Sequence, residues 1–367
     1  MAHNCTDDTA DVVREYASSQ DKLKVVVYEY NNPDEKTKDF ALKKLFENIK
    51  EDYSIECVEG YFVFDADNVV SKNYFTKMNE AFDAGNKIIT SFRNSKNLNR
   101  NWISFGNSIH WIRTCLNENR AKSIVKLACR VQGTGFLFAN ELVKNGWRYT
   151  TFTEDRSFCS DAVVQNYNIN YCDEAIFYDE QPYQLKYTQR QRLRWAKGHL
   201  QSTVENSPKL LKNMFNNKYN FARSYDCFIL NFPRAIESVI RKIIIFILKI
   251  IIVVTMPPLL VGSGLPSFLY IEKFVCTSLP DYLKVACIVY AIGLIKTWLA
   301  SIGNVILIFI KYGKRLEKDK NIFRRIFNVI VFPFVDIIGK WSMYIALFAK
   351  VEWKTIPHDT VVDVNKL

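Results

Sequence analysis

The sequence has 367 residues, of which 49% are hydrophobic and 14% aromatic. This composition excludes a mostly disordered protein, and the modest glycine and proline content excludes a collagen-like chain. The length suits two or three folded units. The net charge of +11 is compatible with an anionic membrane face, a polyanionic substrate or nucleic acid.

Cysteine and histidine usage argues against a zinc site. The nine cysteines include no C-x-x-C pair, and the four histidines do not complete a zinc-like spacing. An odd, scattered set of cysteines indicates reduced thiols in a cytosolic setting. The opening residues have neither a basic nor an apolar segment, so we expect no signal peptide there.

The first 240 residues alternate between strand-like and helix-like stretches. Apolar runs at 23–30, 61–64 and 87–91 predict strands, and the amphipathic stretches 38–51 and 72–84 predict helices between them. This order predicts an α/β fold with a mostly parallel sheet, in which ligands sit at the carboxyl ends of strands. Further helices are expected within 96–130 and from 141–146.

The composition changes beyond residue 240. Residues 242–262 and 285–310 are nearly all apolar, and each is long enough for a membrane span, which needs roughly 20 residues. The alternative is a pair of buried core helices, which rarely run so long without polar residues. A third stretch, 326–349, is apolar but holds Pro333 and Asp336, so it fits a span, a re-entrant segment or an interfacial helix.

Basic residues flank the apolar stretches. They precede the first at Arg234 and Arg241 and follow the second within 311–325, whereas 263–283 is nearly neutral. By the positive-inside rule, the polar half and the 311–325 loop both face the cytosol. Basic residues beside a membrane also account for much of the net charge, and the sequence has no nucleic-acid-binding motif.

The first chemical signal is the pair Asp65 and Asp67, which follows the apolar run 61–64. Two carboxylates at the end of a strand are ligands for Mg²⁺ or Mn²⁺, and such an ion bridges to a diphosphate. Taken alone, the pair fits a solvated turn equally well.

The second signal is Glu154 beside Asp155. A carboxylate in a water-poor site acts as a general base towards an acceptor hydroxyl. Taken alone, adjacent acids also fit the first turn of a helix, where they stabilise the helix dipole.

The third signal is the basic stretch 189–198, which contains Gln191, Arg192, Arg194 and Trp195. Clustered guanidinium groups bind phosphates, glutamine hydrogen-bonds hydroxyls, and tryptophan offers a flat face to a sugar ring. Taken alone, the stretch also fits a basic amphipathic helix on a membrane surface.

In this order, and followed by apolar spans, the three motifs resemble the processive family 2 glycosyltransferases, which include cellulose, hyaluronan, chitin and poly-N-acetylglucosamine synthases. The resemblance covers nearly the whole chain, and its most specific part is the Gln-Arg-x-Arg-Trp pattern. Supporting stretches are 4–10, similar to the nucleotide-binding turn; Lys38; Gly133-Thr134-Gly135, similar to the acceptor-side glycines; and 351–358, similar to the tail after the last membrane helix.

The resemblance implies a GT-A glycosyltransferase domain that inverts the sugar's anomeric centre. Asp155 would be the general base with Glu154 beside it, and Asp67 together with Asp65 would hold Mg²⁺ or Mn²⁺. The nucleotide sugar would be bound by Asp7, Lys38, Asp65, Gln191, Arg192, Arg194 and Trp195, and the acceptor by Gly133, Thr134, Gly135 and Trp195.

Two features depart from the family pattern. Family members normally carry an N-terminal membrane helix and a first strand ending in an acidic pair, whereas this sequence starts inside that region with Ala2 and His3 at the uracil-side positions. Thr37 replaces the glycine that usually precedes Lys38. We therefore expect this polypeptide alone to bind nucleotide weakly.

The sequence thus predicts a multi-pass cell-membrane enzyme with a cytosolic catalytic domain, which transfers sugar from a UDP-sugar to a growing polysaccharide or oligosaccharide. One alternative is a non-processive transferase acting on a lipid or polyprenyl phosphate, and another is an inactive membrane scaffold. The expected divisions are a catalytic domain at 1–215, an interfacial region at 216–241, membrane helices at 242–350 and a cytosolic tail at 351–367.

Overall fold

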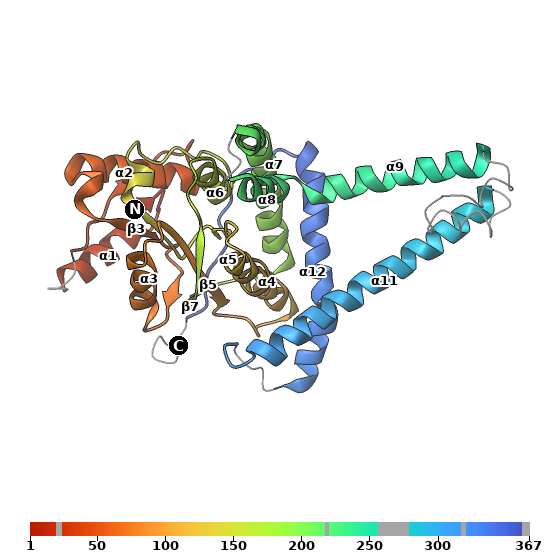
Figure 1. Cartoon of the computed structure of the whole chain (residues 1–367). Coiled ribbons are helices and arrows are strands. Elements are labelled where there is room, and N and C mark those ends of the chain that lie inside the picture. Colours follow the sequence, from red (N-terminus) through yellow and green to blue (C-terminus); the bar gives the residue numbers. More distant parts are fainter. Residues whose placement is uncertain (20–23, 217–219, 256–278, 317–320, 362–367) are drawn as a thin grey trace. The chain divides into compact units, whose positions relative to one another are not determined.

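A computed structural model describes the chain except for residues 20–23, 217–219, 256–278, 317–320 and 362–367 (Figure 1). It divides into two compact units, one formed by Met1–Pro233 together with Ile338–Leu367 and the other by Arg234–Ile337. The first unit holds the sheet and its helices, and the second is helical.

The main sheet of the first unit has five strands in the order β3-β6-β5-β7-β4. Only the β5–β7 pair is parallel; the other three pairs are antiparallel. The prediction of a mostly parallel sheet is therefore wrong. No sequence pattern indicated β6 or β7, and each of the four strand pairs contains one of these two strands. The strands are β3 (Gly60–Val63), β4 (Val69–Val70), β5 (Ile88–Ser95), β6 (Phe136–Ala139) and β7 (Asn170–Asp179).

A separate two-stranded parallel pair joins β1 (Ala2–His3) to β2 (Glu29–Tyr30). The strand expected over 23–30 is reduced to Glu29–Tyr30, and residue 23 lies outside the described residues. The loop after β1 continues into the helix α1 (Thr9–Ser18).

Helices surround the sheet where the amphipathic patterns placed most of them. The predictions for 38–51, 72–84 and 96–130 are confirmed, the last as two α-helices joined by a π-helix at Thr114–Asn119. The stretch from residue 141 forms only the 3-10 turn Asn140–Val143. The α-helices are α2 (Lys38–Asp52), α3 (Tyr74–Asp83), α4 (Trp102–Arg113), α5 (Arg120–Ile124), α6 (Glu154–Val164), α7 (Leu185–Asn216) and α8 (Phe221–Asn231).

An aromatic core fixes α6 against the sheet. The ring of Phe158 on α6 lies 5.4 Å from that of Phe138 on β6 and 5.5 Å from that of Trp147. Phe46 on α2 also stacks with Trp147, and all four side chains are buried. Packed aromatic rings of this size dominate core energetics, so the first turn of α6 is held rigidly.

The second unit consists of α9 (Arg234–Thr255), α11 (Leu279–Tyr312) and the start of α12 (Ile322–Phe348), which ends in the first unit. Among the described residues, one segment, Cys287–Tyr312, is long and apolar enough to cross a membrane. The first expected span, 242–262, is helical up to Thr255, and its remainder lies outside the described residues. A multi-pass arrangement therefore stays a prediction, as does the placement of 326–349, which is helical through Phe348.

Candidate functional site

The first acidic motif lies in the loop that follows β3. The ammonium of Lys38, at the start of α2, forms an ion pair with Asp65 and donates to the carbonyl oxygen of Gly133 at 2.7 Å. The Asp65 backbone N–H donates to Thr134 Oγ1 at 2.9 Å. Lys38 and Thr134, which are far apart in the sequence, thus both contact Asp65.

Asp67 lies deeper in the same loop. Its Oδ2 accepts a hydrogen bond of 3.1 Å from the backbone N–H of Glu180, and its Oδ1 accepts one of 3.0 Å from Asn68. Burial and the nearby carboxylate of Asp179 raise the pKa of Asp67. Asp179 Oδ1 is itself buried and has no hydrogen-bond partner in the described part of the chain.

This environment fits a divalent cation. An ion beside Asp67 would relieve the repulsion between the two carboxylates, and Asp65 lies close enough in sequence to share it. Within the described ranges, no three His, Cys, Asp or Glu side chains already converge as a metal site. Such an ion would therefore draw its remaining ligands from phosphate oxygens and water, as Mg²⁺ commonly does.

The second acidic motif forms the first turn of α6. Glu154 is 7% exposed, and burial, then the charge of Asp155, raise its pKa to about 8 against the opposing effects of Lys38 and Arg194. A methyl group on Gly133 would lie 3.8 Å from Asp155 Oδ2. The two acidic motifs therefore face each other across the Gly133 segment.

Two cations lie near this group of acids. Burial alone would lower the pKa of Lys38, but Asp65, Glu154 and Asp155 outweigh it and raise that pKa. The same three carboxylates oppose the effect of burial on Arg194, whose pKa is lowered. We call Lys38, Asp65, Glu154, Asp155 and Arg194 the charged cluster.

Arg194 reaches the charged cluster because α7 approaches the start of α6 very closely. A Cβ atom on Gly198, one helical turn after Arg194, would lie 2.7 Å from the backbone nitrogen of Thr153. Only glycine allows this approach without displacing the backbone of one element.

Trp195 and Arg192 point to a different neighbourhood from Arg194. The ring of Trp195 meets that of Trp111 on α4 edge to face at 5.2 Å. The guanidinium of Arg192 lies 5.0 Å from the Trp195 ring and donates to Asn107 Oδ1 at 3.1 Å. On α7, Trp195 therefore belongs to an aromatic patch with Trp111, whereas Arg194 belongs to the charged cluster.

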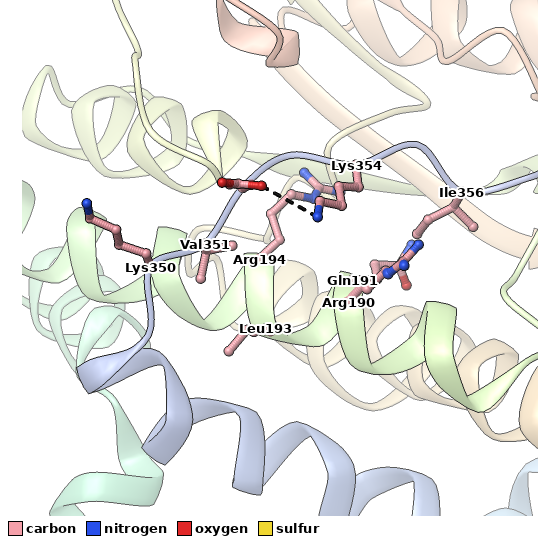
Figure 2. Close-up of a pocket in the computed structure, with 9 residues that line it drawn as sticks. Arg190, Gln191, Leu193, Arg194, Lys350, Val351, Lys354 and Ile356 are labelled. Carbon is pink, nitrogen blue, oxygen red and sulfur yellow. Dashed lines mark ion pairs between the residues drawn. The ribbon is translucent and has the colours of Figure 1, made fainter.

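The C-terminal segment 350–361, here called the tail, contributes to the site. A cavity of about 210 Å³ lies between α7 and the tail, and Arg194 and Gln191 line it together with Lys354 (Figure 2). Figure 2 shows the tail crossing over α7, with Glu352 and Lys354 joined by an ion pair. The tail therefore adds a cation to a groove that the helix alone leaves open.

Further along, the tail reaches the acidic loop. His358 Nδ1 lies 3.4 Å from Asp67 Oδ2. The buried Glu180 accepts hydrogen bonds from the backbone N–H groups of Asp359 and Thr360 at 3.2 and 3.0 Å. Arg100 holds Asp359 at 2.6 Å. The family resemblance pointed to 351–358, but no sequence argument assigned Glu180 or Arg100 a place in the site.

Two further predicted site residues, Asp7 and Gly135, stand apart from the charged cluster. Asp7 is exposed, and its Oδ1 accepts the backbone N–H of Thr9 at 3.2 Å. Gly135 has φ +64°, and a Cβ there would overlap the ring of Phe177. Gly135 thus meets a packing requirement, and assignments of Asp7 to the nucleotide and of Gly135 to the acceptor stay predictions.

The raised pKa of Glu154 predicts a pH-dependent stability. Its folded-state value of about 8 lies above the ordinary 4.5, so its contribution to stability is complete at low pH and is lost as the pH rises through about 8. The variant Glu154→Gln should melt near the parent's temperature at pH 5. At pH 9 it should melt higher, by roughly 2–4 °C for each kcal/mol that ionisation removes. Thermal unfolding followed by tryptophan fluorescence tests this, and a pH-independent gap would contradict it.

Comparisons with known proteins identify the family to which the chain belongs. A family model described as "Glycosyltransferase like family 2" matches residues 1–198. A Bacillus subtilis (strain 168) protein named probable glycosyltransferase YdaM is 25% identical over 214 residues, which are 53% of this chain and 46% of that protein. The chain therefore spans about half the length of this curated relative.

A mannosyltransferase from Pyrobaculum calidifontis, solved in complex with GDP-mannose and Mn²⁺, aligns over 92% of this chain and 75% of that chain. Its identity is 11% and its TM-score 0.43. The family match covers more than half of the chain and contains both acidic motifs and the basic helix motif. The chain belongs to the family 2 glycosyltransferases, and its α/β domain is built on a mixed sheet.

Proposed function

We propose that this glycosyltransferase moves a sugar from a nucleoside diphosphate donor to an acceptor hydroxyl with inversion, with Asp155 as the general base. The convergence of Lys38, Asp65, Asp155 and Arg194 in one charged cluster carries the proposal. The bond between the acceptor oxygen and the sugar's C1 forms as the bond from C1 to the diphosphate oxygen breaks. The acceptor proton passes to Asp155, and the nucleoside diphosphate leaves with its charge.

The cations and acids divide this work. A departing diphosphate needs positive charge near its oxygens, which Lys38, Arg194 and Lys354 supply, and a divalent ion held by Asp67 and Asp65 would supply more. Burial raises the pKa of Glu154 to about 8, so Glu154 holds its proton at neutral pH and is not the proposed base. One base suffices for a single in-line displacement.

We infer the classes of donor and acceptor from the sequence motifs and the family that they resemble. We propose a UDP-sugar donor and a polysaccharide or oligosaccharide acceptor, whose sugar rings would stack on the Trp195 and Trp111 patch. Gln191 and Arg192 would bind at the edges of that patch. Cys287–Tyr312 supports membrane attachment, with the first unit in the cytosol. The alternative acceptor, a lipid or polyprenyl phosphate, would yield a product of one added sugar.

Removal of the metal tests this proposal. Membranes carrying the full chain are incubated with radiolabelled nucleotide sugars, and we expect incorporation from at least one UDP-sugar. EDTA should lower it by about 100-fold or more, and excess Mg²⁺ or Mn²⁺ should restore it.

Two matched variants locate the effect. Asp67→Asn should abolish the response to added metal, whereas Asp83→Asn, at the end of α3, should keep it. Incorporation unaffected by EDTA would remove the metal from the proposal, and no incorporation from any nucleotide sugar would overturn the function. The chain length of the product distinguishes a polysaccharide from a single transfer to lipid.

A further inference from the structure

A second, small cavity lies beside the start of α6. It measures about 30 Å³, and the side chains of Arg130 and Arg156 line it together with Cys159, Cys227 and Asn231. A space of this size is far smaller than a sugar ring, so it suits one small group. Because two arginines line this cavity, a negatively charged group would be favoured inside it.

No carboxylate of the described residues forms an ion pair with either arginine. Arg156 donates to the carbonyl oxygen of Leu230 at 2.9 Å, and the Arg130 guanidinium lies 5.8 Å from the ring of Trp111. Burial and the charge of Arg130 lower the pKa of Arg156 to about 10. Burial raises the thiol pKa of Cys227 to about 11, so it supplies no negative charge at neutral pH. Asp155 and Glu118 oppose the shift of the Arg156 pKa from nearby, but in the described part of the chain neither arginine is neutralised by an ion pair.

The cavity adjoins the acceptor side of the site. Arg156 directly follows Asp155, and Arg130 stands three residues before Gly133, which faces the Asp155 carboxylate. The backbone N–H of Val131 donates to Cys159 Sγ at 3.4 Å, which fixes the Arg130 segment against α6. The Arg130 guanidinium also lies 5.8 Å from the ring of Trp111, the partner of Trp195. Arg130 thus lies near the aromatic patch, and Arg156 lies near the proposed base.

We propose that the acceptor sugar carries an acidic group and that Arg130 and Arg156 bind this group, so that a nearby hydroxyl is presented to Asp155. The inference rests on the proposed function and specifies its acceptor. The acidic group is a carboxylate of a uronic acid or a phosphate that links the sugar to a lipid. Both accept charge-assisted hydrogen bonds from guanidinium groups.

Equilibrium binding to the full chain in lipid nanodiscs tests the proposal. One arm compares an oligosaccharide ending in glucuronate with its carboxyl-reduced, neutral counterpart. The other arm compares a sugar joined to polyprenyl phosphate with the same sugar joined to the uncharged polyprenol. We expect the acidic member of at least one pair to bind about tenfold more tightly or better.

Variants then assign the preference to the two arginines. Arg130→Gln should remove most of it, Arg130→Lys should retain part, and Arg156→Gln should weaken it if the variant melts as the parent does. The control Arg148→Gln changes an exposed arginine that pairs with Asp161, and it should leave the preference intact. Equal binding within both pairs, or a preference that survives Arg130→Gln, would overturn the inference.

The outcome is separable from that of the proposed function. Binding is measured without donor, so it does not depend on turnover. Transfer from a UDP-sugar to neutral and acidic acceptors alike, without any binding preference, would refute the acidic acceptor and leave the glycosyltransferase reaction standing. A charge preference without transfer from any donor would refute the reaction and retain the anion site.

Discussion

Replacing Asp155 by asparagine is expected to lower the rate of sugar transfer by roughly 10²–10⁴-fold, the range typical for loss of a general base. Asparagine keeps the size and hydrogen-bonding capacity of the side chain but cannot accept the acceptor's proton. The loss should appear in the rate at saturating donor, because the cations Lys38 and Arg194 remain in place to hold the diphosphate. Radiolabelled sugar transfer by membranes measures it.

A matched control lies on the same helix. Asp161 accepts hydrogen bonds from Arg148 and Tyr149 near the end of α6, at 2.6 and 2.7 Å, and faces no member of the charged cluster in the described chain. Asp161→Asn should lower the melting temperature slightly and leave the transfer rate within about twofold. If Asp155→Asn retained the parent's rate while Asp67→Asn lost it, the general base would have to be another residue.

Replacing Gly198 by alanine should have the second large effect. The added Cβ would lie 2.7 Å from the Thr153 nitrogen and 2.8 Å from its side chain, and the first contact is with backbone that cannot rotate away. Either α7 or the first turn of α6 must shift, which separates Arg194 from Glu154 and Asp155. We expect a destabilisation of about 1–3 kcal/mol, as for other overpacked sites, and a loss of transfer beyond what the residual folded fraction explains.

Gly303 provides the comparison for this substitution. It is also a helical glycine, on α11, and a Cβ there would meet nothing within 4 Å. Gly303→Ala should therefore leave the melting temperature unchanged or raise it, because alanine favours helix. Melting curves and transfer rates for both variants test the idea, and equal behaviour would show that the approach at Gly198 is not required.

Local sequence signals predicted the parts of the site that depend on short-range order. The pattern of α2 placed Lys38 at a helix start, and the apolar run before Asp65 placed that carboxylate at the end of a strand. Both features hold, and the ion pair between Lys38 and Asp65 joins them. Hydrophobic periodicity suffices for such elements because each buries one face against the same core.

The missed parts depend on contacts between distant segments. β7 carries mixed residues over Asn170–Asp179 and breaks its register with β5 between Ser91 and Phe92, so it shows no clean alternation. Its last residue, Asp179, forms a buried ion pair with Arg93 of β5 and lies beside Asp67. No period or motif in the sequence reports a pairing of that kind, which tertiary structure alone decides.

The contacts of the tail were also beyond prediction from the sequence. A motif resemblance flagged 351–358, but its neighbours Glu180 and Arg100 are more than 170 residues away in sequence, as the bond from Asp359 to Glu180 shows. Glu180 accepts three hydrogen bonds from Asp359 and Thr360, and its own N–H supports Asp67. The position of the candidate metal carboxylate is therefore tied to the tail.

The hydrogen bonds between the tail and Glu180 have a consequence for biosynthesis. During translation Asp67 and Glu180 leave the ribosome long before Asp359 and Thr360 are made, so a nascent chain cannot form those bonds. The helices α9, α11 and α12 are synthesised in between. Folding of this part of the chain therefore finishes only after residues 359–360 have left the ribosome, and products of premature termination within α12 would lack this support of Asp67.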